Sequence, residues 1–333
     1  MELSSTAIIP SGNPERVDGC LQRLVRQTVP FDRIIIAVWG TSIKEREEVS
    51  RRAHSVLRSA EVVESGTDVR PETNLNNAIK YLSNRPTNRV AFLNDDTLLD
   101  DHWHESMQQA AQKDGDHVVH ASVVFFKFFP NFIQSAGHIL YNSKPRDHKY
   151  RKMISGLADA SQPLCPCGNS AFVPWNALQE IQRGHPEVWD PNFIRWQSCF
   201  DFGLKLRLRG YDCRLVSSAR AVHEGYLDKS LRGQKLKDED VKIQLRSRIF
   251  LYGKFFPEKE RKEAMKILES SLDRWARGGY PHAGRKVKGD VIRSMYACAK
   301  IEAKNLLEKT STEWLQLLSC LNVQLRRKWL FGE

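Results

Sequence analysis

The stretch RVAFLNDDTLLDDHW (Arg89–Trp103) decides how the rest of the chain is interpreted. Its apolar run at 90–93 stops abruptly at Asn94, Asp95 and Asp96. Short apolar runs bounded by polar residues are typical of buried strands. Adjacent carboxylates at the end of such a strand are costly unless a cation or water meets them. The stretch therefore indicates either an acidic turn or a metal site.

Upstream of this stretch, short apolar runs alternate with amphipathic segments. In the segment 14–29, for example, Val17, Leu21, Leu24 and Val25 recur at helical spacing. Strands and helices that alternate at short intervals predict βαβ units and a mostly parallel sheet. Ligands bind at the carboxyl ends of the strands in such sheets, and the acids lie at one of these ends. Strands are expected at 6–10, 32–38, 61–65 and 89–96, and helices at 14–29, 42–60 and 73–84.

Beyond the acids the chain continues with further strands and helices. A helix is expected at 100–113, a long β-rich run at 117–129, and a further strand and turn at 131–142. After a polar, loop-like segment at 145–163, a strand leads into a helix that starts at Trp175. A helix that ends at the C-cap glycine Gly210 precedes a last strand, which leads to His223. We interpret residues 1–226 as one α/β domain.

The character of the chain changes at about residue 227. Residues 226–333 hold 24 Lys and Arg against 14 Asp and Glu, which is nearly the whole net charge of +11. Such an excess fits a polyanionic partner (nucleic acid, an anionic membrane surface or a charged glycan), and it also fits a solvated helical face. We predict a basic, α-helical C-terminal region at 227–333. Helical periodicity occurs at 238–256, 258–279, 289–310 and 312–331, with a Gly/Pro break at 277–286.

The bulk composition is that of a soluble globular protein, with 41% hydrophobic and 27% charged residues among 333. No run of eighteen apolar residues occurs, so no transmembrane helix is expected, and the N-terminal stretch shows no secretory signal. The seven cysteines are odd in number and scattered, which favours a reducing, cytoplasmic compartment. Cys165 and Cys167 are the only close pair in the sequence, and a single C-x-C is weak evidence for zinc.

The order and spacing of six segments carry a family resemblance. The segments are IIPSGNP at 8–14, NLNNAI at 74–79, VAFLNDD at 90–96, CGNSAFV at 167–173, WDPNFIRWQSCFDFGLKLRLRGYDC at 189–213 and ARAVHEG at 219–225. Together they resemble the family-2 glycosyltransferases of the GT-A fold, in the rhamnosyl- and galactofuranosyl-transferase-like branch, over about residues 5–255. The resemblance implies a Rossmann-like, mostly parallel sheet flanked by helices, an α-helical C-terminal extension, and a nucleotide-sugar donor.

The resemblance also implies a role for the acids after the 89–96 strand. Members of the family carry a short D-x-D motif there, which holds Mn²⁺ or Mg²⁺ against the donor's diphosphate. In this chain Asn94, Asp95 and Asp96 occupy the motif, with Asp96 as the expected metal ligand and Asn94 as a weaker one. His223 falls where the family often places a metal-binding histidine, and a neutral imidazole suits Mn²⁺. An Asx-rich turn and a capping or core histidine remain the alternatives.

The catalytic base is where the chain departs most from the family. An inverting transferase needs a carboxylate to take the proton of the acceptor hydroxyl. The family pattern is roughly W-x-E-D-x-D-x-x-x-R, and it begins here at Trp196. Ser and Cys replace the E-D pair at 198–199, so that only Asp201 of these acids is retained. Asp201 is the expected base, with Asp190 or Glu187 as alternatives, and weak or absent catalysis is a further outcome left open.

The resemblance places the donor against the first two strands. Residues 10–12 follow the first strand, where the nucleoside would rest, and Asn76 or its neighbour Asn77 matches a family asparagine. Trp39 stands where the family commonly has an acid that reads the base, and a Trp there can stack on the base instead. The expected donor-binding residues are Pro10, Ser11, Gly12, Trp39, Asn76, Asn94 and Asp95.

The CGNSAFV segment matches the part of the family fold that lines the acceptor. Gly168 permits close backbone approach, and the side chains of Asn169 and Ser170 can bind hydroxyls. Trp196 can stack on a sugar face. A β-bulge at Gly168 and a core position for Trp196 are the alternatives.

Three functions remain open from the sequence. The first is an inverting, divalent-metal-dependent glycosyltransferase that moves a hexosyl or pentosyl group to a polysaccharide or lipid-linked glycan, with Trp-bearing C-terminal helices on an anionic membrane. The second keeps this chemistry but uses a hydroxylated or modified base of DNA, as in some phage enzymes, with the basic helices on the phosphates. The third is a degenerate, non-catalytic GT-A binding module. The expected location is cytoplasmic, either peripheral to a membrane or associated with DNA.

Overall fold

A computed structural model of the chain describes residues 3–141, 144–154, 162–185, 187–194, 197–224, 238–278 and 289–310. The chain forms two compact units. One consists of Met1–Ile139, Asp147–Pro191 and Asp201–Glu224, and the other of Leu140–Arg146, Asn192–Phe200 and Gly225–Glu333. The division at residues 226 and 227 stays a prediction from the sequence.

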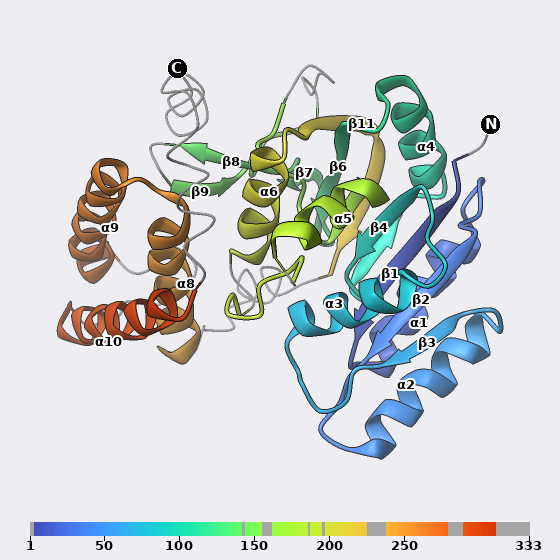
Figure 1. The fold of residues 1–333 in the computed structure, drawn as a ribbon, viewed down its shortest axis with the longest axis horizontal. Coiled ribbons are helices and arrows are strands. Elements are labelled where there is room, and N and C mark those ends of the chain that lie inside the picture. The colour runs from blue at the N-terminus through green and yellow to red at the C-terminus, as the bar shows by residue number, and fades with distance from the viewer. Residues whose placement is uncertain are drawn as a thin grey trace. The chain divides into compact units, whose positions relative to one another are not determined.

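The first unit is built on one large sheet. Its strands are β1 (Ser5–Ser11), β2 (Arg33–Val38), β3 (Glu61–Glu64), β4 (Arg89–Leu93), β5 (Thr97–Leu99), β6 (Val118–Phe126), β7 (Phe129–Ser135), β10 (Ser170–Pro174) and β11 (Asp212–His223). They lie in the order β3-β2-β1-β4-β10-β6-β11-β5, with β7 beside β6 (Figure 1). β1 is parallel to β2 and β4, and β6 is parallel to β11, whereas β10 runs antiparallel between β4 and β6. The mostly parallel sheet is therefore confirmed.

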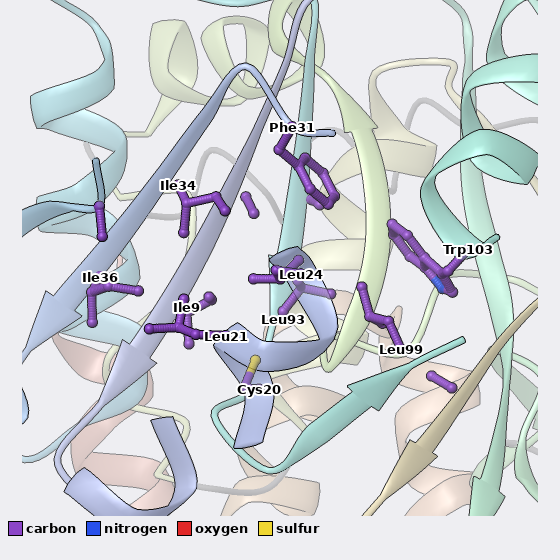
Figure 2. Close-up of a cluster of buried hydrophobic side chains, with 14 of the residues drawn as sticks. Ile9, Cys20, Leu21, Leu24, Phe31, Ile34, Ile36, Leu93, Leu99 and Trp103 are labelled. Carbon is purple, nitrogen blue, oxygen red and sulfur yellow. The ribbon is translucent and has the colours of Figure 1, made fainter. Parts of the chain in front are cut away.

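Helices flank this sheet and bury both of its faces, which explains why the central strands read as continuous apolar runs. The helices are α1 (Pro14–Val25), α2 (Ile43–Val56), α3 (Pro71–Leu82), α4 (Trp103–Asp114), α5 (Trp175–Gly184) and α6 (Ser198–Leu208). Alternate residues of each strand point to opposite faces. Ile9, Ile36 and Leu93 thus share a core with Leu21 and Leu24 of α1, as Figure 2 shows.

Several element boundaries differ from the sequence prediction by a few residues, for example at the ends of α1 and α2, and two short strands depart from it more clearly. β5 is absent from the prediction because a strand of three residues carries no periodicity that a pattern can detect. β9 (Lys144–Asp147), which pairs with β8 (His138–Tyr141), extends into the segment predicted to be a polar loop. α3 begins at Pro71, two residues before the predicted start, since proline is favoured in the first helical turn.

The second unit contains the helices α8 (Asp238–Phe255), α9 (Glu258–Gly278) and α10 (Gly289–Glu308). Each lies within a segment predicted to be helical, whereas the fourth predicted helix, at 312–331, falls outside the described residues. Along the parts of the chain that the structure describes, no helix combines the length and the apolar character needed to cross a membrane.

The positive charge of the C-terminal region is not concentrated on these three helices. Together they carry 13 Lys and Arg against 11 Asp and Glu. The stretches 225–237, 279–288 and 311–333, which lie outside the described residues, hold 10 against 3. The predicted contact of basic helices with a polyanion therefore stays a prediction, and the sequence locates most of the positive excess in those three stretches.

Candidate active site

The acidic triplet lies where the central strands end. β1 and β4 run parallel, with Ile8 opposite Phe92, so Ser11 and the residues after Leu93 reach the same edge of the sheet. The backbone N–H of Thr97 donates to the carbonyl of Asn94 at 3.1 Å, which closes a turn around the acids. The Ser11 hydroxyl donates to Asp95 Oδ2 at 2.8 Å. The end of β1 and the acidic turn after β4, which were both predicted to bind the donor, are thus joined by a hydrogen bond.

The short strand β5 brings His223 to this turn. β5 pairs antiparallel with β11, and the register sets His223 opposite Thr97, the residue after Asp96. The backbone N–H of Glu224 donates to the carbonyl of Asp96 at 2.8 Å, which continues the pairing. As a result, His223 Nε2 lies 3.0 Å from Asp96 Oδ1. Two predicted metal ligands that are 127 positions apart in the sequence are therefore in direct contact.

The imidazole of His223 is oriented by Gln134 of β7. Nδ1 of His223 lies 3.3 Å from Gln134 Oε1 and 3.0 Å from Gln134 Nε2. When Gln134 Nε2–H donates to Nδ1, the Nε2–H of His223 donates to Asp96; when Nδ1–H donates to Oε1 instead, the lone pair of Nε2 faces the carboxylate oxygen of Asp96. Two electron-rich atoms at 3.0 Å require a proton or a cation between them, and a fixed outer hydrogen bond is typical of metal-binding histidines. Carboxylate oxygens and an imidazole nitrogen form a donor set that fits Mn²⁺.

Arg16 of α1 is a member of this site that the sequence analysis missed. Its Nη1 lies 3.5 Å from Asp96 Oδ2 and 4.0 Å from Asp95 Oδ1. Pro14 and the N-cap Asn13, whose side chain accepts from the N–H groups of Glu15 and Arg16, start the helix that carries it. The signal available in the sequence was a basic residue in the first turn of a helix that begins at a predicted ligand-binding edge.

The two carboxyl groups titrate differently because their neighbours differ. Burial, together with the charge of Asp96, raises the pKa of Asp95 to about 6 and outweighs the opposite effects of Ser11 and Arg16. Burial also raises the pKa of Asp96, but the combined effect of His223 and Arg16 is larger and opposite, so the pKa of Asp96 is lowered overall. Of the two acids, Asp96 is thus the one whose ionised form this environment favours.

Gly12 and Trp39, which were predicted to bind the nucleoside, are in close contact. The backbone N–H of Trp39 donates to the carbonyl of Ser11 at 3.1 Å, which holds β1 and β2 together at their ends. A Cβ at Gly12 would lie 2.7 Å from three atoms of the Trp39 ring. The half-buried indole therefore lies directly over the glycine backbone, and only glycine fits beneath it in this arrangement.

We expect Gly12→Ala to displace Trp39, since the added methyl group overlaps the ring. The free energy of unfolding should fall by about 1–3 kcal/mol, which urea denaturation measures. The double variant Gly12→Ala/Trp39→Ala should recover most of that loss relative to Trp39→Ala alone, because the clash partner is gone. Equal losses in the two backgrounds would contradict the contact.

The side chain of Asn76, on α3, forms two hydrogen bonds with the backbone of Trp189. Its Nδ2 donates to the carbonyl of Trp189 at 2.7 Å, and its Oδ1 accepts from the N–H of Trp189 at 3.0 Å. The Trp189 ring stacks on Phe202 of α6 at 4.4 Å between centroids, and both pack edge-on against Phe92 of β4. Asp190, the alternative base, is buried directly after this clamped residue. Its role and the predicted donor contact of Asn76 stay predictions.

Asp201, the expected base, forms a buried ion pair with Lys205, which lies one helical turn further along α6. Lys205 Nζ lies 2.7 Å from Asp201 Oδ2, and both side chains are fully buried. Lys205 also donates to the carbonyl of Val188 at 3.1 Å and to that of Glu187 at 3.4 Å. The lysine therefore connects α6 to the segment that carries the two alternative bases.

The predicted acceptor segment leads into the first residue of β10. Ser170 is buried, and its hydroxyl accepts from Ser122 at 2.7 Å while lying 3.4 Å from Asn169 Oδ1. The N–H of Ser170 donates to the carbonyl of Cys167 at 3.2 Å across a turn that contains Gly168. Asn169 is also buried, and Trp196 lies outside the described residues. The acceptor roles of these residues stay predictions.

Comparison with known proteins decides the family. Residues 6–172, which include most of β1, the acidic triplet and the start of β10, match the family described as glycosyl transferase family 2. The chain belongs to glycosyl transferase family 2. The family-2 class predicted from the motifs is therefore confirmed. A comparison with curated proteins finds no match.

Two solved structures show the fold of this family-2 chain. The crystal structure of GalNAc-T7 with UDP, GalNAc and Mn²⁺ aligns with a TM-score of 0.61 and 9% identity, over 98% of this chain and 58% of that one. S. aureus TarS aligns with a TM-score of 0.51 and 13% identity, over 95% of this chain and 54% of that one. The chain thus spans little more than half the length of either protein. Likeness at these identities concerns the fold alone, and it confirms the predicted GT-A fold.

Proposed function

We propose that this family-2 chain transfers a hexosyl or pentosyl group from a nucleotide-sugar to an acceptor hydroxyl, with inversion and with Mn²⁺ or Mg²⁺ as cofactor. The observation that supports this proposal is the 3.0 Å contact between Asp96 Oδ1 and His223 Nε2 at the carboxyl edge of the sheet. In open α/β sheets this edge is where ligands bind. The crystal structure of GalNAc-T7, which shares the fold, contains UDP, GalNAc and Mn²⁺, and we propose a nucleotide-sugar and a divalent cation for this chain by analogy.

Asp96 and His223 would hold the cation, with Asn94 as a weaker ligand. When bound, a divalent cation neutralises the negative charge that develops on the leaving nucleotide diphosphate. The Arg16 guanidinium, 3.5 Å from Asp96 Oδ2 and partly exposed, adds a fixed positive charge at the same edge. Ser11 fixes the Asp95 carboxylate through its hydroxyl, which orients the second acid of the turn. Trp39 over Gly12 offers an indole ring at the expected nucleoside position.

Asp201 would act as the base that takes the proton of the acceptor hydroxyl. A carboxylate in this role accepts a proton during attack, and Lys205 Nζ, 2.7 Å from Asp201 Oδ2, holds the side chain of Asp201 in place. The pair is fully buried, so the proposal requires the acceptor hydroxyl to approach Asp201 from within the fold when donor and acceptor are bound. Asp190 remains the second candidate, and loss of the E-D pair at 198–199 leaves a non-catalytic binding module as the competing function.

For the acceptor we propose a polysaccharide or lipid-linked glycan, as the rhamnosyl- and galactofuranosyl-transferase-like branch suggests. A modified base of DNA is the second candidate, and the positive excess at 225–237, 279–288 and 311–333 is the observation that favours it. Retention on DNA that falls steeply with added salt, and that weakens on replacing Arg285, Lys286 and Lys288 by Gln, would support DNA. Binding to anionic liposomes without DNA retention would support a membrane-bound glycan acceptor.

The donor site is tested by thermal unfolding with a panel of nucleotide-sugars, with and without Mn²⁺. A ligand that binds only the native state stabilises it, by about 2.7 kcal/mol at 100 times its dissociation constant. We expect one nucleotide-sugar to raise the melting temperature markedly more with Mn²⁺ than without it. A panel that leaves the melting temperature unchanged would refute the donor site. Donor binding without hydrolysis or transfer would favour the binding module.

A further inference from the structure

A second group of metal-ligating side chains lies beyond the acidic turn. His138 of β8, Asp147 of β9 and Cys167 place one ligand atom each within 4.8 Å of the others. His138 Nδ1 lies 3.0 Å from Asp147 Oδ1. His138 is buried, whereas Asp147 and Cys167 are partly exposed, so the group opens to solvent on one side. None of the three belongs to the donor, metal or base sets described above.

Backbone hydrogen bonds hold the three segments in place. The N–H of His138 donates to the carbonyl of Cys165 at 2.8 Å, and the N–H of Leu164 donates to the carbonyl of His138 at 2.7 Å. On the other side, the N–H of His148, next to Asp147, donates to the carbonyl of Gly137 at 2.8 Å. The ligand atoms therefore come from strands and a turn that are already joined, which is the preorganisation that a metal site needs.

The two cysteines of the C-x-C motif have different surroundings. Cys165 is buried against Gly203 of α6, where an added Cβ would lie 1.9 Å from the Cβ of Cys165. Gly137, at φ +87°, likewise leaves room for Pro163 and the Cys165 carbonyl. Cys165 is thus a packing residue that anchors the motif. Cys167, two residues on and partly exposed, shares its space with an imidazole and a carboxylate.

We propose that His138, Asp147 and Cys167 bind one Zn²⁺ ion, with a water molecule as the fourth ligand. Thiolate, imidazole and carboxylate are the three zinc ligands of proteins, and three protein ligands with one open position suit a tetrahedral ion. Ligands at about 2.0–2.3 Å from such an ion are roughly 3.5 Å from one another, and the three ligand atoms here lie within 4.8 Å of one another. The softer thiolate favours Zn²⁺ over Mg²⁺ or Mn²⁺ here.

The proposed zinc site lies next to the proposed acceptor segment, so a bound ion would affect that segment. Cys167 is followed immediately by Gly168, Asn169 and Ser170, the proposed acceptor segment. A bound ion would join the β8–β9 hairpin to the turn that starts this segment and so restrict the turn. This consequence rests on the proposed acceptor role, whereas zinc binding itself does not depend on it.

The test uses the full chain, freed of metal with a chelator and titrated with Co²⁺, which replaces Zn²⁺ and gives a thiolate-to-cobalt charge-transfer absorption. We expect this absorption to saturate at one ion per chain and to disappear on adding Zn²⁺. It should be lost in Cys167→Ser and kept in Cys298→Ser, whose exposed cysteine lies on α10. Asp147→Asn should weaken Co²⁺ affinity by at least about 10-fold, since even the loss of an outer-shell partner has an effect of this size.

The thiolate-to-cobalt absorption distinguishes Co²⁺ bound at this site from Co²⁺ bound at the acidic turn. Neither Asp96 nor His223 supplies sulfur, and Cys20 near the turn is fully buried, with its pKa raised far above the usual range by burial and by Asp95 and Asp96. Absorption that persists in Cys167→Ser, or no absorption in the parent chain, would overturn the proposal. Circular dichroism of each variant establishes that a lost band is not a lost fold. Co²⁺ binding that survives Asp96→Ala would leave this site standing even if the donor site fails.

Discussion

Asp96→Ala is expected to abolish Mn²⁺-dependent donor binding and to lower kcat/KM by about 10³-fold, or about 4 kcal/mol. Asp96 is the acid that contacts His223 Nε2 at 3.0 Å and Arg16 at 3.5 Å, so its loss removes the centre of the proposed metal site. The side chain is buried, and Asp95, the neighbouring acid, lies farther from Arg16, at 4.0 Å.

Asp95→Ala should weaken donor binding less, by about tenfold. Asp95 accepts the Ser11 hydroxyl at 2.8 Å and lies farther from Arg16, so its role in the site is to shape the turn. Asp100→Asn is the matched control, because Asp100 is an exposed acid at the end of β5, and asparagine keeps the oxygen that accepts the N–H of His102. Binding is followed by titrating free Mn²⁺ and by calorimetry with the donor found in the thermal screen. Equal tolerance of Asp96→Ala and Asp95→Ala would make the stretch an ordinary Asx-rich turn.

The sequence predicted the strands and the acids, but it did not predict why the acids and His223 meet. Buried strands such as β4 have apolar runs long enough to detect, and their carboxyl ends follow from the βαβ order. The contact itself depends on β5, three residues whose antiparallel pairing with β11 sets Thr97 opposite His223. Pairing of such a short strand is decided by tertiary packing, so no local pattern could reveal it.

Arg16 and Gln134 were missed for the same reason. Each becomes part of the site only through its position in the fold, Arg16 on the first turn of α1 and Gln134 on a strand beside β6. The Lys205 partner of Asp201 was also missed, but in this case a local signal exists in the sequence. Asp201 and Lys205 are four positions apart in the apolar segment FDFGLKLRL, and such spacing places two side chains on one face of a helix.

Lys205→Met is expected to be among the most destabilising substitutions in the first unit. It removes the ammonium that lies 2.7 Å from the Asp201 carboxylate in a place where neither side chain is exposed. Breaking a buried ion pair by removing one partner costs about 3–5 kcal/mol, because a charge remains in a medium of low polarity. Urea unfolding should show this loss, and Lys309→Met, a change of a lysine beyond the end of α10, is the control for the substitution itself.

The double variant Asp201→Asn/Lys205→Met separates stability from catalysis. Removing both charges leaves no uncompensated ion, so most of the lost free energy of unfolding should return. If Asp201 is the base, the double variant should fold and bind the donor but turn over at least about 100-fold more slowly, because general base catalysis contributes about 10²–10⁴-fold. Normal turnover in this stable variant would exclude Asp201 as the base and restrict its role to the ion pair. It would also direct the search for the base to Asp190 and Glu187, on the segment to which Lys205 donates its hydrogen bonds.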